Sequence, residues 1–183
     1  MSGIEFLFSF YSLLLGLAVA NVVTGFAESW QMRARTSLGL STLLLGLLIL
    51  FRAAQQWLSV SGASATLTMD AWNVLTSMGM ALPYIFISRA MLPREHDNCT
   101  HLDDYYLQNS RALMLALLVP PAVSLARNVA VFGLEGMPVD LFAVKYGIPL
   151  LVPVALLFSR HQWHHRVGLT LLVVLIVVLM LLS

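Results

Sequence analysis

Charged residues are scarce in this sequence: Lys, Arg, Asp and Glu together make up 10% of its 183 residues. Hydrophobic residues make up 59%, and the mean hydropathy is +0.84, a value that soluble proteins rarely reach. The net charge is only +1 and no basic domain is present, which argues against a nucleic-acid-binding protein. The composition therefore predicts a chain that lies mostly within a lipid bilayer.

Cysteine and the common catalytic motifs are also lacking. Cys99 is the only cysteine, so no internal disulfide can form. The sequence has no GxSxG, P-loop, Gly-rich dinucleotide fingerprint or CxxCH haem site. Because no nucleophile is accompanied by a base, we expect neither an enzyme nor a bound cofactor.

The chain divides into six apolar segments, each close to the roughly 20 residues that cross a hydrocarbon core. They lie at residues 4–27, 37–58, 70–92, 104–132, 139–159 and 165–182. The first begins "MSGIEF", without a basic leader region, so we expect it to remain as a helix. Since the loops between segments are short, the sequence predicts an all-α, polytopic membrane protein in which residues 1–183 form a single membrane domain.

Arginines and acidic residues fall in alternate loops, which predicts the orientation. Three loops and their flanks are basic: they carry Arg33, Arg35, Arg89, Arg94, Arg111, Arg160 and Arg166. The N-terminus and the other two loops lack basic residues and contain Glu5, Asp70, Glu135 and Asp140. Basic loops are retained in the cytoplasm, so both termini are expected on the periplasmic side.

Three cations fall within the outer part of the predicted bilayer. Arg127 lies sixteen residues beyond Arg111, about 24 Å along a helix, and Arg52 follows Arg35 by a similar length. Lys145 comes shortly after Asp140 on a helix that runs inward. Two interpretations stay open: the three side chains extend to the outer interface, or they point inward and line a pocket.

The second interpretation predicts a ligand site for a polar or anionic solute. Ionisable groups inside a membrane often mark solute pathways. Arg52, Gln55 and Gln56 share one helix face because they are three and four residues apart. The candidate ligand-binding residues are Arg52, Gln55, Gln56, Arg127, Asn128 and Lys145, with Glu5 and Asp140 as partial charge partners.

All five histidines fall on the predicted cytoplasmic side, near Cys99. The candidate metal ligands are His96, Cys99, His101, His161, His164 and His165. His161 is three and four residues before His164 and His165, which suits a helix-borne metal pair. No HExxH or paired CxxC fixes a geometry, so solvated groups at the interface are the favoured interpretation, and the metal site is unknown.

Two weaker patterns concern packing. Ser12, Gly16, Ala20 and Thr24 recur every four residues, a stripe that lets another helix approach closely, and we expect that helix to belong to the same chain. Short similarities between residues 4–92 and 104–182, such as "ANVVTGF" with "RNVAVFG", are compatible with a weak 3+3 inverted repeat.

Two segments define the layout of the chain. The first predicted helix contains "FYSLLLGLAVANVVTGFA" and is followed by a basic loop. The fourth predicted helix starts with an acidic, tyrosine-rich stretch, "HLDDYYLQNSRALMLALL". In this layout the chain resembles an uncharacterised family of small six-helix bacterial inner-membrane proteins. The resemblance implies a multi-pass protein of the bacterial inner membrane and carries no site residues. From the residues alone, Asp103 and Asp104 suit the positive end of a helix dipole, and Tyr105 and Tyr106 suit an interfacial aromatic belt.

Two classes of function stay open. The first is a small transporter or permease-like protein that binds a polar or anionic solute in an outward-facing pocket. The second is an accessory or scaffold subunit without transport or catalysis of its own, whose apolar faces contact lipid and other membrane proteins. The expected partners are the lipid bilayer, a small solute, and a membrane-protein partner or a second copy of the chain, but not nucleic acid.

Overall fold

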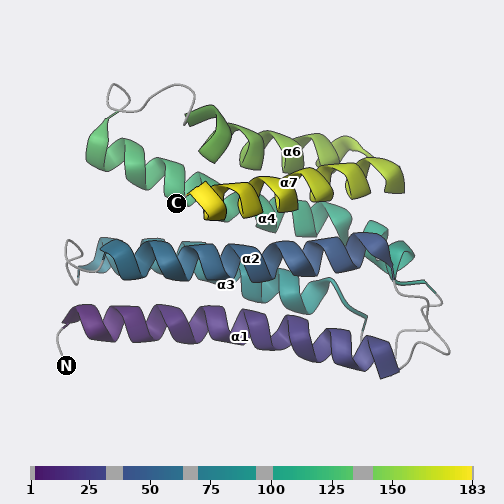
Figure 1. Ribbon diagram of the computed structural model, residues 1–183, viewed down its shortest axis with the longest axis horizontal. Coiled ribbons are helices and arrows are strands. Elements are labelled where there is room, and N and C mark those ends of the chain that lie inside the picture. Colours follow the sequence, from purple (N-terminus) through teal and green to yellow (C-terminus); the bar gives the residue numbers. More distant parts are fainter. Residues whose placement is uncertain (1–2, 32–38, 64–69, 94–100, 134–141, 183) are drawn as a thin grey trace.

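The computed structural model describes residues 3–31, 39–63, 70–93, 101–133 and 142–182. In this part of the chain every regular element is a helix (Figure 1), as predicted. The helices are α1 (Gly3–Gln31), α2 (Leu40–Ala63), α3 (Ala71–Ala90), α4 (Leu102–Phe132), the π-helix η1 (Ala143–Gly147), α6 (Ile148–Phe158) and α7 (Gln162–Leu182). Because η1 leads directly into α6, the two correspond to the fifth predicted segment.

Successive helices run in opposite directions, and both chain ends lie toward the same end of the bundle (Figure 1). The other end, where α2, α4 and α7 begin, is called the basic end here because it carries Arg89, Arg111, Arg160 and Arg166. Helix α1 packs against α2 and α3, α3 against α4, α4 against α6, and α2 against α7. The bundle thus has α1 on one side and the α6–α7 pair on the other.

Four helices are long and apolar enough to cross a membrane. The spans are Glu5–Gln31, Leu40–Leu58, Leu102–Ala130 and Gln162–Leu181. The segment Ala143–Phe158 is apolar but shorter, and α3 is not among the four. Helix α3 carries Asn73, Thr76 and Ser77 in its first two turns, which lowers its apolar character. These helices are compatible with a membrane protein.

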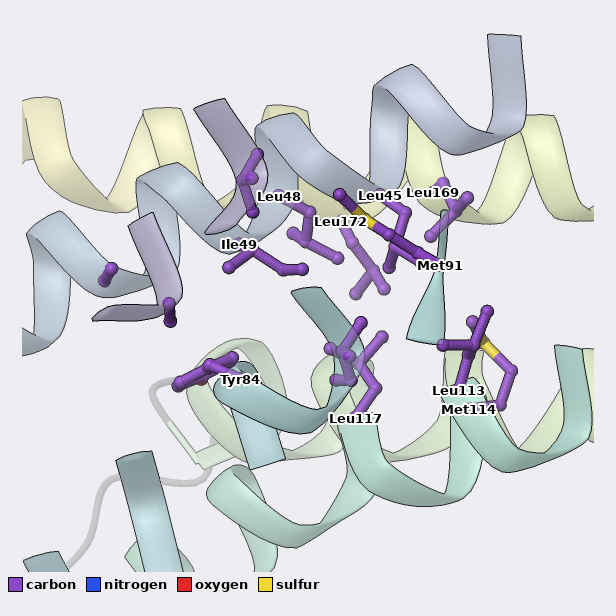
Figure 2. Close-up of a cluster of buried hydrophobic side chains, with 14 of the residues drawn as sticks. Leu45, Leu48, Ile49, Tyr84, Met91, Leu113, Met114, Leu117, Leu169 and Leu172 are labelled. Atoms are coloured by element: carbon purple, nitrogen blue, oxygen red, sulfur yellow. The ribbon is translucent and has the colours of Figure 1, made fainter. Parts of the chain in front are cut away.

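The core lies where α2, α3, α4 and α7 meet (Figure 2). Its fully buried side chains include Leu45, Leu48, Ile49, Met91, Leu113, Met114, Leu169 and Leu172. Figure 2 shows Tyr84 at one end of this group and Leu113 and Met114 toward the other. Such interdigitated aliphatic side chains stabilise helix contacts by van der Waals packing even where the surroundings are as apolar as lipid.

The prolines are accommodated in two ways. Helix α4 contains Pro120 and Pro121 and still runs without interruption from Leu102 to Phe132. Pro149 follows immediately after the π-helical turn of η1. A proline ring clashes with the carbonyl of the residue four positions earlier, here Lys145, and a π-turn widens the backbone at that point. The regular α-helical backbone is therefore interrupted in the fifth predicted segment.

Most of the small-residue stripe of α1 does not pack within the chain, so the prediction is wrong for Gly16, Ala20 and Thr24, while Ser12 is partly buried. Gly16, Ala20 and Thr24 are exposed, and a Cβ added at Gly16 would meet no atom within 4 Å. The close approaches of α1 involve other positions: Gly25 lies against Leu92, and Phe26 lies against Gly46. The small face of α1 points away from the bundle because the larger residues Tyr11, Leu15 and Val22 occupy its buried face.

The helix packing of the two halves differs. Helix α1 packs closely on α3, whereas the corresponding pair of the second half, α4 and α7, is not among the close pairs formed by the described residues. A two-fold relation between the halves would require both pairs. The packing therefore gives no support to the inverted repeat.

Candidate functional site

The predicted ligand residues on α2 lie together in the half of the bundle away from the basic end. Arg52 Nη1 donates a hydrogen bond to Gln55 Oε1 over 3.2 Å, as their spacing on one helix face predicts. Both side chains are partly buried, as is Gln56. The guanidinium is thus held against the helix bundle by a neutral amide.

Two tyrosines that the sequence analysis did not single out complete this group. The Tyr11 hydroxyl on α1 lies 3.5 Å from Gln56 Oε1, and Gln56 also hydrogen-bonds the Tyr84 side chain on α3. Tyr84 also lies near Arg52. Both tyrosines are buried, at 1% and 2% exposure, so their hydroxyls need internal partners.

Arg127 joins this group from α4. It is partly buried and lies near Tyr11. We call Tyr11, Arg52, Gln56, Tyr84 and Arg127, with Gln55, the arginine–tyrosine cluster. It draws on α1, α2, α3 and α4. A tyrosine in the middle of an otherwise apolar helix was the signal that could have identified Tyr11 and Tyr84, because a buried hydroxyl requires a partner.

The remaining predicted ligand residues form a separate group or lie at the surface. Asn128 donates a hydrogen bond to the Tyr146 hydroxyl, and the Lys145 ammonium lies 5.7 Å from the centre of the Tyr146 ring. Lys145 itself is exposed. Glu5 is exposed in the first turn of α1, about 9 Å along the helix from Tyr11. Asp140 lies outside the described residues.

The arginine–tyrosine cluster carries positive charge that no carboxylate of the described residues balances. Neither Arg52 nor Arg127 has an Asp or Glu oxygen within ion-pair distance in the described ranges, where Arg166–Asp103 is the ion pair found. Burying an unpaired charge is costly, and a bound anion offsets that cost. The geometry therefore favours an anion or a strongly polar acceptor group.

A second polar network lies at the basic end. Asp103 on α4 accepts two hydrogen bonds: one from Arg166 Nη2 over 2.9 Å, and one from the Ser41 backbone N–H over 3.0 Å. Ser41 lies in the first turn of α2, whose backbone N–H groups have no partner within the helix. Asp103 therefore caps α2 from a neighbouring helix, a role beyond the predicted match to its own helix dipole.

Tyr106 and His165 form the buried part of the same network. Both side chains are 0% exposed, and the Tyr106 hydroxyl lies 2.8 Å from His165 Nδ1. The predictions of an interfacial belt position for Tyr106 and a solvated position for His165 are therefore wrong. Both side chains point into the bundle, where α7 begins three residues earlier than predicted and carries His165 inward.

The histidines do not form a metal site within the described residues. No group of three or more His, Cys, Asp or Glu side chains there is arranged to hold a metal ion. His161 and His164 stack edge to face with ring centres 5.7 Å apart, while His165 is engaged with Tyr106. His101 is exposed at the start of α4. His96 and Cys99 lie outside the described residues.

A cleft of about 360 Å³ opens between the first turns of α2, α4 and α7. Its lining includes His101, Asp104, Gln162 and Arg166, and Gln162 donates a hydrogen bond to Asp104 over 3.3 Å. The lining mixes both signs of charge, so it gives no preference for an anion or a cation.

Comparison with protein-family models, curated proteins and solved structures found no match to this chain. Its function therefore has to be argued from the two polar groups described above.

Proposed function

We propose that the protein is a multi-pass membrane protein that binds a small anionic or strongly polar solute at the arginine–tyrosine cluster. The observation that carries the proposal is Arg52, a partly buried guanidinium hydrogen-bonded to a neutral amide, with no carboxylate among the described residues in an ion pair with it. Arginine can hold an anion through two parallel N–H groups. Gln55, Gln56 and the tyrosine hydroxyls add neutral hydrogen-bonding groups that select for shape.

The proposed setting is the bacterial inner membrane, with six spanning helices, the basic end in the cytoplasm and both termini in the periplasm. The distribution of arginines supports this orientation. In it, Arg52 lies about 9 Å from the periplasmic end of the Leu40–Leu58 span, within reach of solutes from that side. A small transporter or permease-like protein is the function that such a site suits best.

The first experiment is native mass spectrometry of the protein extracted at its natural abundance. A monomer or homo-oligomer that carries a small adduct supports the proposal and identifies the solute. The adduct, together with phosphate, sulfate and small carboxylates as defined probes, is then tested for its effect on thermal unfolding. A solute at 100 times its dissociation constant stabilises the folded protein by about 2.7 kcal/mol.

Neutral variants locate the site. Arg52→Gln and Arg127→Leu should keep the protein level and fold but remove the solute-dependent rise in Tm. The matched control is Arg111→Gln, which changes an exposed arginine on α4 at the basic end. This variant should still show the solute-dependent rise in Tm. The proposal is wrong if no probe raises Tm, or if the rise persists in Arg52→Gln. An Arg127→Leu protein that is more stable and otherwise unchanged would show that Arg127 extends to the interface instead.

The exposed small face of α1 favours a second candidate function. Gly16, Ala20 and Thr24 lie on one outward stripe that would let a helix of another protein approach closely. This stripe suits an accessory or scaffold subunit of a membrane complex. A stoichiometric protein partner in the same mass spectrum would support that function in place of the solute site.

A further inference from the structure

His165 uses both ring nitrogens. Nε2 lies 3.1 Å from the Ser159 carbonyl oxygen, and Nδ1 lies 2.8 Å from the Tyr106 hydroxyl. A carbonyl oxygen can only accept a hydrogen bond, so Nε2 must carry the proton. In a neutral imidazole Nδ1 is then the acceptor, and the Tyr106 hydroxyl donates to it. The neutral Nε2–H tautomer satisfies all three groups.

Protonation of the ring breaks this arrangement. An imidazolium has N–H groups at both positions, so Nδ1 would have to donate to the Tyr106 oxygen. The Tyr106 proton would then need another acceptor, yet Tyr106 is fully buried and its described hydrogen bond is the one to His165. A buried donor without an acceptor is destabilising, and water cannot replace the partner at 0% exposure.

Among the described residues, the charged groups around His165 are paired with each other or exposed. On α4 the nearest acid, Asp103, is paired with Arg166 of α7 at 2.9 Å, so the two charges largely offset each other. On α7 His164 is exposed and binds the Ser159 hydroxyl. Asp104 and Arg160 are exposed, and the part of α2 near Asp103 contributes an uncharged backbone N–H. No Asp or Glu oxygen of the described residues lies within ion-pair distance of the His165 ring.

The bond matters because side chains, rather than close helix packing, join α4 to α7 at the basic end. Helix α7 packs on α2 and α6, while α4 packs on α3, α6 and α2, and the pair of α4 and α7 is not among the close pairs of the described residues. Three polar contacts connect the first turns of α4 and α7: Asp103 with Arg166, Asp104 with Gln162, and Tyr106 with His165. Of the three, the Tyr106–His165 contact is the fully buried one.

We propose that His165 is a pH-sensitive latch that holds the first turns of α4 to the start of α7 while its ring is neutral, and that loses this contact when the ring takes up a proton. Histidine is the side chain whose charge ordinarily changes between pH 5 and 8. The latch is independent of the proposed solute site, since its residues lie at the opposite end of the bundle.

The test uses the detergent-solubilised full chain in two measurements. Nitrogen NMR of histidine-labelled protein at pH 8 should show His165 with Nε2 protonated and Nδ1 bare. The Tm should fall from pH 8 to pH 5.5 in the wild type, and this fall should be smaller by about 3 °C or more in His165→Gln, which cannot take up the proton. The matched control is His164→Gln, an exposed histidine on the same turn, which should keep the wild-type fall.

Two results would overturn the latch. One is an Nδ1–H tautomer at pH 8, a measurement on the wild type that needs no variant to fold. The other is a Tm that falls equally with pH in the wild type and His165→Gln.

Discussion

Asp103 on α4 accepts the backbone N–H of Ser41 in the first turn of α2 over 3.0 Å. The two residues lie 62 positions apart, so the contact fixes how the starts of α2 and α4 sit against each other. Asp103 can reach Ser41 because residue 39, just before α2, is a glycine. A Cβ at Gly39 would overlap the Asp103 carboxylate. The helix cap on Ser41, the ion pair with Arg166 and the space left by Gly39 therefore all depend on the position of the Asp103 carboxylate.

Replacing Asp103 by Asn should destabilise the protein. The change removes the charge that pairs with Arg166 and weakens the cap on α2, and Asp103 is only 7% exposed. Hydrogen bonds to charged groups of this kind contribute about 1–3 kcal/mol. Thermal and denaturant unfolding in detergent measure the loss. Asp104→Asn, an exposed neighbour, should change stability by less than about 0.5 kcal/mol, and equal effects of the two changes would contradict the role assigned to Asp103.

Gly39→Ala should also destabilise, by about 1–3 kcal/mol, because it crowds a packed site. The added Cβ would lie 2.7 Å from the Asp103 backbone nitrogen, which cannot move aside as a flexible side chain can. Gly16→Ala provides the opposite case, since a Cβ there meets nothing within 4 Å. That change should stabilise by about 0.5–1 kcal/mol, because glycine is unfavourable inside a helix. If Gly39→Ala melts at the wild-type temperature, α2 and α4 do not approach as described.

The helices were predictable because their apolar length is a local property of the sequence. The start of α7 was not predictable in this way, because its first turn is polar. The helix begins at Gln162. Just before it, the Ser159 hydroxyl accepts a hydrogen bond from the His161 backbone N–H over 3.4 Å. The predicted segment began at His165 itself, three residues later. His165 therefore lies one turn inside α7 rather than at its first position, and its side chain is buried in the bundle.

The candidate site was predictable in its level along the bundle but not in its contacts. Counting residues along each helix placed Arg52 and Arg127 at a common level, and each lies near a buried tyrosine. Which helices are neighbours depends on side-chain packing over the whole bundle. Hence Tyr11 and Tyr84, which reach Gln56 from α1 and α3, could not be assigned to the site from their own helices. Lys145, at a similar predicted level, is exposed.

The proposed orientation can be tested with the single natural cysteine. Cys99 precedes α4, whose first turn lies at the basic end with Arg166, so the proposal places it in the cytoplasm. A maleimide that cannot cross membranes should leave Cys99 unlabelled in intact cells and label it once the membrane is permeabilised. Cys99→Ser combined with Glu135→Cys moves the thiol to a loop proposed to be periplasmic, and that protein should be labelled in intact cells. Labelling of Cys99 from outside, with Glu135→Cys protected, would invert the orientation. The arginine–tyrosine cluster would then face the cytoplasm, and the solute it binds would have to be sought among cytoplasmic anions.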